Sequence, residues 1–249
     1  MARRWPENLW IVRHGQSAGN VARDAADEAA LDRIAIHGRD VDVALSALGK
    51  EQAAALGQWF AQSSDQPDVV FASPYQRALQ TASLVQHAGG MEQIPVVADE
   101  RLREKEFGIL DGYTLSGVRR HFPEQAEIRH VMGKFYHRPP GGESWCDVIL
   151  RLRSLLDTVV LHHADRNVLI VGHQVVVLCL RYILEAMSER QILEIDAAGD
   201  VANCSVTHYR RDDNTSDHLS LVRYNYVVPV EQVAVEVTRA PDPPVAARG

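Results

Sequence analysis

Four short apolar runs, separated by longer segments of mixed polarity, most constrain what this chain can fold into. The runs are residues 9–12, 69–72, 95–97 and 168–171. Runs of this length that are bounded by polar residues are typical of buried strands. Helical patterns lie between them, so the strands are expected to be parallel, in one sheet with helices on both sides. The sequence therefore predicts an α/β fold of three layers (αβα) with a mainly parallel central sheet.

The predicted helices begin at recognisable cap residues. Ser46 is an N-cap serine for a helix that runs to Phe60. Ser73 followed by Pro74 predicts a second helix start, because proline is favoured at the first helical position, and the glycines at 89–90 end that helix. The remaining predicted elements are helices over 145–163 and 175–184, and late strands over 204–209 and 219–224 that alternate in polarity as a hairpin does.

Length and composition predict one enlarged domain. The chain has 249 residues, of which 46% are hydrophobic and 24% charged, as in an ordinary globular protein that folds without disulfides or a structural metal. We expect a single domain over residues 1–239, with an insertion at about 21–42 and a cap over a site at about 113–142. The Pro- and Ala-rich residues 240–249 are predicted to be a disordered tail.

Charge and cysteine content limit the kinds of binding partner and the cellular compartment that we expect. The chain carries 26 basic and 33 acidic residues, a net charge of −7, which disfavours a nucleic-acid or membrane-surface binder. No apolar run approaches the roughly 20 residues of a membrane span, and no signal peptide is recognisable. Cys146, Cys179 and Cys204 show no CxxC spacing, which predicts reduced thiols and a cytoplasmic protein. The oligomeric state stays open, a homodimer included.

Two histidines follow predicted strands. Arg13, His14 and Gly15 come at the end of the first strand, and Gly172 and His173 come at the end of the last of the four. Ligands of open α/β sheets bind outside the carboxyl ends of the strands, so both histidines are expected to face one crevice. A lone histidine is usually an ordinary core or loop residue. The paired placement beside an arginine, with two glycines that permit close backbone approach to a ligand, favours a site.

Arg77 is predicted to lie in the first turn of the helix after the second strand. Helix N-termini bind anions, and a guanidinium adds a fork suited to phosphate. Together with Arg13 and the two histidines it would form a cationic pocket, which suggests a phosphoryl ligand. A neutral imidazole can attack phosphorus, and the leaving oxygen then needs a proton from an acid. Glu104 and Glu106 are the candidate acids, although Glu106 fits an ordinary solvated charge run.

These residues are part of an ordered set of motifs that resembles the histidine phosphatase superfamily, with its phosphoglycerate mutase-like fold. The resemblance covers about residues 9–225, and the set is far more specific than the Arg-His-Gly tripeptide alone. The matching segments are residues 9–17 (LWIVRHGQS) with Asn20, Leu45-Ser46 with Gly49, Gln52 and Ala53, Ser73-Pro74 with Arg77, Ala78, Thr81 and Ala82, residues 102–108, and Gly172-His173.

The resemblance implies a role for each matching residue. His14 would be the nucleophile that becomes phosphorylated, and Glu104 aligns with the family's proton donor, which favours it over Glu106. Ser17 and Asn20 would lie near the phosphate or the substrate. The residues that would hold the phosphoryl oxygens are Arg13, Arg77 and His173. No metal or other cofactor is implied, because the arginines supply the positive charge and the histidines show no metal-binding spacing.

The segments after the acid loop resemble the phosphatase branch of the family. Residues 107–113 depart from the arginine- and tyrosine-rich stretch of the mutases, whereas residues 136–144 and 172–174 resemble the fructose bisphosphatase domain of a bifunctional glycolytic regulator and related bacterial phosphatases. The expected substrate is a small phosphorylated metabolite such as a sugar phosphate. The candidate substrate contacts outside the phosphate loop are Gln174, Tyr136, Arg138 and Glu143, and for the last three an ordinary surface role stays open.

Three other functions are weighed against this one. Residues 15–19 match the G-x-S-x-G turn of serine hydrolases, but no earlier strand is present to supply the oxyanion loop. A non-catalytic phosphate-binding module could dispense with the nucleophile and the acid, and this chain has both. A cofactor-dependent phosphoglycerate mutase would interconvert 3- and 2-phosphoglycerate, stimulated by the bisphosphate, where a phosphatase releases phosphate to water.

Overall fold

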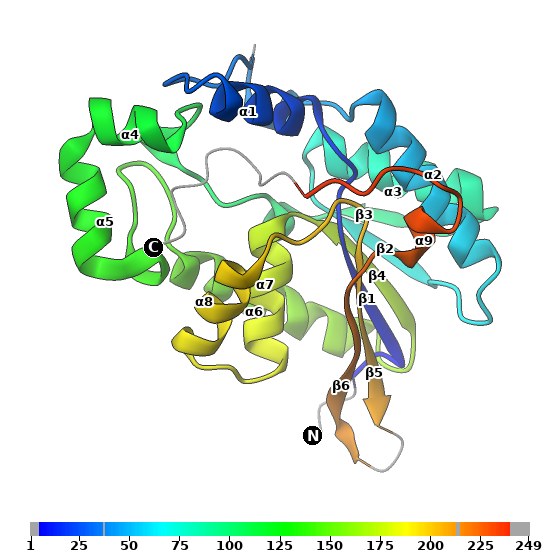
Figure 1. Cartoon of the computed structure of the whole chain (residues 1–249). Coiled ribbons are helices and arrows are strands. Elements are labelled where there is room, and N and C mark those ends of the chain that lie inside the picture. Colours follow the sequence, from blue (N-terminus) through cyan, green and yellow to red (C-terminus); the bar gives the residue numbers. More distant parts are fainter. Residues whose placement is uncertain (1–4, 37, 213–214, 240–249) are drawn as a thin grey trace.

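The computed structural model describes residues 5–36, 38–212 and 215–239, and helices cover both faces of its sheet (Figure 1). Within these residues the sheet has the order β3-β2-β4-β1-β5-β6. The first four strands in this order pair in parallel, whereas β5 and β6 are antiparallel. The strands are β1 (Asn8–Arg13), β2 (Val69–Ala72), β3 (Val96–Ala98), β4 (Asn167–Gly172), β5 (Val206–Asp212) and β6 (Thr215–Tyr226). The predicted α/β fold with a mainly parallel sheet is confirmed.

Helices follow most of the strands along the chain. The α-helices are α1 (Ala18–Glu28), α2 (Ala47–Ala61), α3 (Gln76–Gly89), α4 (Leu115–His121), α5 (Pro123–Tyr136), α6 (Trp145–His162), α7 (Gln174–Leu184), α8 (Glu189–Ala198) and α9 (Val228–Glu231). Short 3-10 turns are η1 (Asp40–Asp42), η2 (Glu100–Leu102) and η3 (Gly108–Leu110). Within the described residues, none of these helices has both the length and the apolar character to cross a bilayer.

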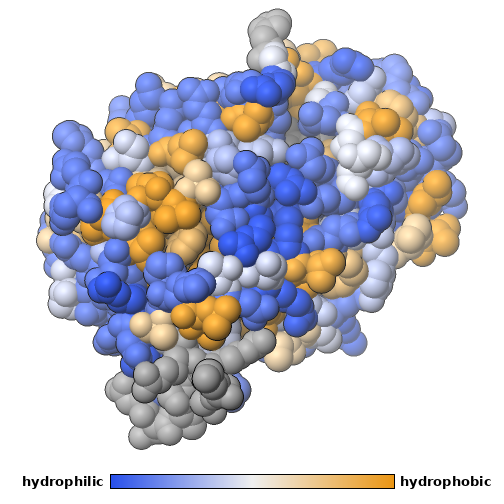
Figure 2. Space-filling model, turned by 180° about the vertical axis from the view of Figure 1, so that it is seen from behind, coloured by the Kyte–Doolittle hydropathy of each residue, from blue (hydrophilic) through white to orange (hydrophobic). Residues whose placement is uncertain are grey.

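Alternate residues of the strands pack against different helix layers. Leu9 and Ile11 of β1 belong to the cluster that contains α6, α7 and α8, whereas Trp10 and Val12 belong to the cluster that contains α2, α3 and α9. Both faces of β1, β2 and β4 are thereby buried, which explains their continuous apolar runs. The edge strand β3 is exposed, so the expectation of a buried strand is wrong for the run at 95–97. Figure 2 shows the outer surface from behind as mainly hydrophilic, with hydrophobic residues in separate groups.

The start of α3 differs from the prediction. The helix begins at Gln76 with Tyr75 as its N-cap, so the assignment of Ser73 as N-cap and Pro74 as first helical residue is wrong. Ser73 instead lies before the helix, where its N–H donates to the carbonyl oxygen of Val171 on the neighbouring strand at 3.0 Å. Arg77 nevertheless falls in the first turn of the helix.

Among the described residues outside the predicted cap, three helices were not predicted from the sequence: α1, α8 and the single-turn α9. The buried residues of α8 are Ile192 and Asp196, and α1 buries small and polar side chains, so neither helix shows a strong apolar stripe. α1 occupies the first part of the predicted insertion at 21–42. The predicted cap contains α4 and α5, which lie with α1 toward the end of the sheet where β1 ends (Figure 1). The predicted tail, residues 240–249, lies outside the described residues.

Gly15 and Gly49 bring the loop after β1 against the first turn of α2. A Cβ at Gly15 would lie 2.4 Å from the carbonyl oxygen of Gly49, and a Cβ at Gly49 would lie 1.9 Å from that of Gln16. The sequence predicted that Gly15 permits close approach of the backbone to a ligand. At Gly15 the structure instead shows a close approach between the loop after β1 and the first turn of α2. Neither backbone neighbour can rotate away as a side chain would, so the packing requires glycine at both positions.

We expect Gly49→Ala to lower the free energy of unfolding by about 1–3 kcal/mol, because the added methyl overpacks a backbone contact. The measurement is the urea midpoint at constant slope. Gly199→Ala is the matched control, since a Cβ there meets no atom within 4 Å. Equal midpoints for the two variants would contradict the proposed packing constraint.

Candidate active site

The pairing of β1 with β4 brings two distant histidines together. Arg13 is in register with Gly172 at the carboxyl ends of these strands, and the N–H of His14 donates to the carbonyl oxygen of Gly172 at 3.0 Å. The rings of His14 and His173 have centroids 5.1 Å apart with planes at 67°. Both residues are fully buried. The structure thus places the two imidazoles next to each other at one edge of the sheet.

Two contacts define the protonation of the His14 ring. Its Nδ1 lies 2.6 Å from the carbonyl oxygen of Gly15, and a carbonyl oxygen can only accept, so Nδ1 carries the proton. Its Nε2 lies 3.2 Å from Nε of Arg77, and a guanidinium can only donate, so Nε2 carries a lone pair. His14 is therefore held as a neutral imidazole whose Nε2 faces a cationic group.

α3 carries Arg77 to this site. Thr81, one turn later, donates its hydroxyl to the carbonyl oxygen of Arg77 at 2.7 Å and accepts from the N–H of Gly15 at 3.1 Å, which ties the helix to the loop after β1. The Arg77 guanidinium lies 4.9 Å from the centroid of the Tyr75 ring. Burial, together with Glu106, raises the pKa of Tyr75, so its hydroxyl stays protonated and donates to Oε1 of Glu106 at 3.1 Å.

Arg13 is held by the segment that follows α8. Its Nη1 donates to the carbonyl oxygen of Val201 at 2.6 Å. In the same segment, Nδ2 of Asn203 donates to the carbonyl oxygen of His14 at 3.0 Å, and the N–H of Cys204 donates to that of Arg13 at 3.0 Å. This support could not be predicted from the sequence, because residues 199–205 contain no recognisable motif and are brought to the site by the pairing of β5 with β1.

Ser73 is a further site residue that the sequence assigned to another role. Its hydroxyl oxygen lies 2.8 Å from Nε2 of His173, and both residues are fully buried. The signal that could have indicated this contact is positional: Ser73 directly follows β2, and β2 is the other neighbour of β4. The hydroxyl therefore orients the second imidazole from the adjacent strand end.

The two candidate acids have different environments. Glu104 is 1% exposed, its Oε1 accepts from the N–H of Lys105 at 2.8 Å, and its Oε2 lies 3.9 Å from Nδ1 of His173. The Glu106 side chain is 47% exposed and contacts Tyr75 and Arg103. The geometry places Glu104 beside the imidazole pair, and Glu106 at the surface.

Basic side chains of α5 lie near the loop that carries Glu104. Burial, together with the positive charge of Arg129 on α5, lowers the pKa of Lys105 to about 8. Lys134, also on α5, forms an ion pair with Asp196 of α8. This side of the site is therefore rich in cations, although the whole chain is acidic.

Ser17 and Asn20 form the N-terminal cap of α1. The Ser17 hydroxyl accepts from the N–H of Asn20 at 3.1 Å, and Oδ1 of Asn20 accepts from the N–H of Ser17 at 2.9 Å. Both are buried directly after the loop that carries His14. Gln174, which follows His173, donates from Nε2 to Oδ1 of Asp200 at 2.9 Å. Their assignment as substrate contacts stays a prediction.

The other three candidate substrate contacts, Tyr136, Arg138 and Glu143, form their polar contacts with residues other than the two histidines and Arg77. Tyr136 is exposed, and a hydrogen bond of its hydroxyl with Glu189 raises its pKa. Arg138 donates from Nε to Oδ2 of Asp147 at 2.8 Å on the surface. Glu143 accepts from Arg151 and from the N–H of Glu106, so it fastens the acid loop to α6. The role of these three as substrate contacts also stays a prediction.

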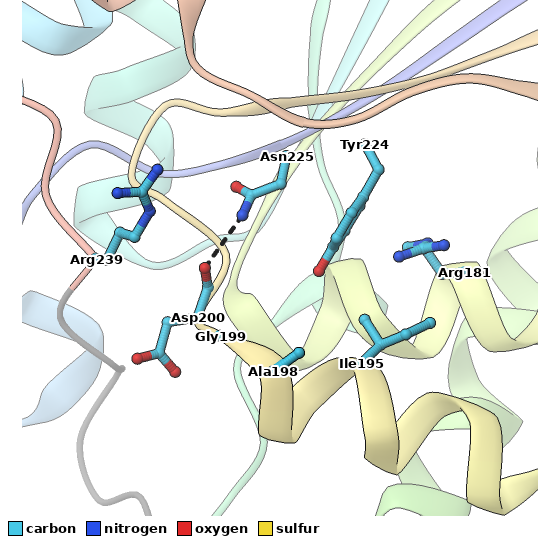
Figure 3. A pocket seen from close by; sticks show the side chains of 8 residues that line it. All are labelled: Arg181, Ile195, Ala198, Gly199, Asp200, Tyr224, Asn225 and Arg239. Atoms are coloured by element: carbon cyan, nitrogen blue, oxygen red, sulfur yellow. Dashed lines mark hydrogen bonds between the residues drawn. The ribbon is translucent and has the colours of Figure 1, made fainter.

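A cavity of about 560 Å³ lies beside α8 and β6 (Figure 3). The Arg181 guanidinium lies 3.8 Å from the centroid of the Tyr224 ring, and Nδ2 of Asn225 donates to the carbonyl oxygen of Asp200 at 3.2 Å. Asp200 connects the cavity wall to Gln174, next to His173. The lining residues are Arg181, Ile195, Ala198, Gly199, Asp200, Tyr224, Asn225 and Arg239.

Metal-ligating side chains do not gather in the part of the chain that the structure describes. No group of three or more His, Cys, Asp or Glu residues is arranged there to hold an ion.

Known proteins resemble this chain over most of its length. The family model for the histidine phosphatase superfamily (branch 1) matches residues 9–225. A 2,3-bisphosphoglycerate-dependent phosphoglycerate mutase of Sinorhizobium fredii is 31% identical over 196 residues, which are 78% of this chain and 86% of that protein. A 6-phosphofructo-2-kinase/fructose-2,6-bisphosphatase of Aquarana catesbeiana is 31% identical over 186 residues, 74% of this chain and 34% of that longer protein. The structure of a mycobacterial glucosyl-3-phosphoglycerate phosphatase is similar, with a TM-score of 0.66 and 26% identity over 88% of this chain and 99% of that one.

Proposed function

The chain belongs to the histidine phosphatase superfamily (branch 1), and on this basis we propose that it is a metal-independent phosphomonoester hydrolase that forms a phosphohistidine at His14. The observation that carries the proposal is the His14 ring, whose Nε2 lone pair lies 3.2 Å from the Arg77 guanidinium. A nucleophile beside a donor fork that suits phosphoryl oxygens is the arrangement that phosphoryl transfer to nitrogen requires.

The reaction proceeds in two displacements. In the first, Nε2 of His14 attacks phosphorus, the ester P–O bond breaks, and Glu104 gives its proton to the leaving oxygen. In the second, Glu104 takes a proton from water, the resulting hydroxide oxygen bonds to phosphorus, and the P–N bond breaks to release phosphate. Arg13, Arg77 and His173 stabilise the negative charge of the transferring group. The bond from Nδ1 of His14 to Gly15 holds the ring while Nε2 is phosphorylated.

The substrate proposed is a small phosphorylated metabolite, such as a sugar phosphate. Lys105, Arg129 and Lys134 supply positive charge on the cap side, where the remainder of such a substrate would lie. Two of the relatives are named for phosphorylated small molecules, fructose 2,6-bisphosphate and glucosyl-3-phosphoglycerate.

A phosphate-release screen tests this function. Sugar phosphates, phosphoglycerates and nucleotides are each incubated with the protein, with and without EDTA. We expect phosphate release from at least one sugar phosphate or phosphoglycerate, unchanged by EDTA. Loss of activity on chelation would refute the metal-independent mechanism. Tight vanadate binding without any turnover would favour a non-catalytic phosphate-binding module.

A phosphoglycerate mutase is the second candidate, because the Sinorhizobium relative carries that name. It predicts interconversion of 3- and 2-phosphoglycerate that the bisphosphate stimulates, with little free phosphate. The departure at residues 107–113 from the mutase stretch argues for the hydrolase. The serine-hydrolase reading fits poorly, since the Ser17 hydroxyl caps α1, and phosphatase activity that survives Ser17→Ala would exclude it.

A further inference from the structure

The turn η1, in the insertion at 21–42, reaches the candidate active site. Nη1 of Arg77 donates to Oδ1 of Asp40 at 3.0 Å and to the Asp40 carbonyl oxygen at 2.9 Å. Nη2 of Arg77 donates to Oδ2 of the same carboxylate at 3.0 Å. One residue of the insertion therefore takes both ends of the Arg77 fork, in the bidentate geometry by which arginine also binds phosphate.

We propose that the Asp40 carboxylate is an internal anion that competes with the substrate: it occupies the Arg77 fork in the free enzyme, and the phosphoryl group must displace it. This inference rests on the proposed function, in which Arg77 binds phosphoryl oxygens. It gives the 21–42 insertion a role in setting how tightly the site binds phosphoryl groups.

The donor count of Arg77 supports the competition. A guanidinium has five N–H groups, and four are directed to Nε2 of His14 and to the three oxygens of Asp40. Once phosphorus bonds to Nε2, that lone pair no longer accepts, and the Nε–H must turn to a phosphoryl oxygen. The other phosphoryl oxygens then meet Nη groups that already donate to Asp40.

The burial of the pair explains why a displaceable anion is present. The Arg77 side chain is 1% exposed, whereas that of Asp40 is 22% exposed. A guanidinium so far removed from water needs a counter-ion, which Asp40 supplies when no phosphoryl group is bound. Asp40 is the more exposed partner, so its carboxylate regains water at lower cost once phosphate has replaced it.

The chain segment after Asp40 is anchored to the site. The N–H of Val43 donates to the Asp40 carbonyl oxygen at 3.2 Å, and the N–H of Leu45 donates to Oε1 of Gln80 on α3 at 2.9 Å. Val43 and Leu45 are both buried. The same helix therefore carries Arg77 and holds the segment that presents Asp40, which makes the contact a feature of the packed fold.

The test compares anion binding by the full-length chain and two variants. Calorimetry with orthovanadate and with inorganic phosphate should give dissociation constants about tenfold lower for Asp40→Asn than for the unmodified chain, because a charge-assisted competitor is weakened. kcat/KM of Asp40→Asn should rise as its binding of the phosphoryl group tightens. Asp42→Asn is the matched control: it removes the same charge from the same turn, but its carboxylate pairs with the exposed Arg39. Asp40→Ser serves as a second variant if Asp40→Asn folds poorly.

Each outcome decides the proposal. Weaker vanadate binding by Asp40→Asn would mean that Asp40 positions Arg77 for phosphate, and a change below twofold would mean that it does not compete; both overturn the inference. In an Arg77→Ala background the effect of Asp40→Asn should vanish, and tightening that persists there would show a general charge effect instead. The proposed function itself fails if the unmodified chain binds neither anion. It also fails if the Arg77→Ala variant binds both anions as tightly as the unmodified chain does.

Discussion

His14→Ala is expected to lower the rate of phosphate release by roughly 10⁴-fold or more, as removal of a covalent nucleophile does in other enzymes. Without the Nε2 lone pair, the first displacement has no acceptor for the phosphoryl group, and water would have to attack the ester directly. Turnover is measured on the best substrate of the screen. Activity within tenfold of that of the unmodified chain would rule out the phosphohistidine route.

The covalent intermediate gives this prediction a second readout. Rapid acid-free quenching with ³²P-labelled substrate should trap label on the unmodified chain in a bond that is labile to acid, as expected for phosphorus on nitrogen, and no label on His14→Ala. His87→Ala is the matched control, because that side chain is 81% exposed and pairs with Glu92 on the surface. The control should keep full turnover and full labelling.

Glu104→Gln is expected to lower kcat by about 10²–10⁴-fold on alkyl phosphates, the range that loss of a general acid causes. Glutamine preserves the size of the side chain but cannot give a proton to the leaving oxygen. The loss should be much smaller for formation of the intermediate from p-nitrophenyl phosphate, whose phenolate leaves without protonation. Burst kinetics on both substrates separate this step from hydrolysis of the intermediate.

Glu106→Gln is the matched control for the acid, since it makes the same change two residues away in the same loop. Its side chain is 47% exposed and contacts Tyr75 and Arg103, so we expect kcat to change by less than about threefold, as for ordinary surface substitutions. A large loss in Glu106→Gln, with near-normal turnover in Glu104→Gln, would reverse the assignment of the proton donor.

Local sequence patterns were sufficient to predict the strands of the sheet and the longer apolar helices. Residues 9–12 and 168–171 are apolar at every position because both faces of β1 and β4 are covered, and this burial is visible in the sequence. α1 and α8 were not predicted, because they bury few apolar side chains. The start of α3 was placed too early. Serine is favoured at N-caps, but the N–H of Ser73 donates to the carbonyl oxygen of Val171 on the neighbouring strand.

The sequence by itself determined the α/β fold class, the strand-end positions of His14 and His173, and the presence of Arg77 in a first helical turn. These follow from short-range periodicity and cap chemistry, which act within a few residues. Only the tertiary structure decided which groups surround His14. Asp40, Ser73 and Asn203 reach the site through strand pairing and loop packing between segments far apart in the chain. Such contacts depend on how the sheet and its loops are assembled, and for this reason no local sequence pattern predicts them.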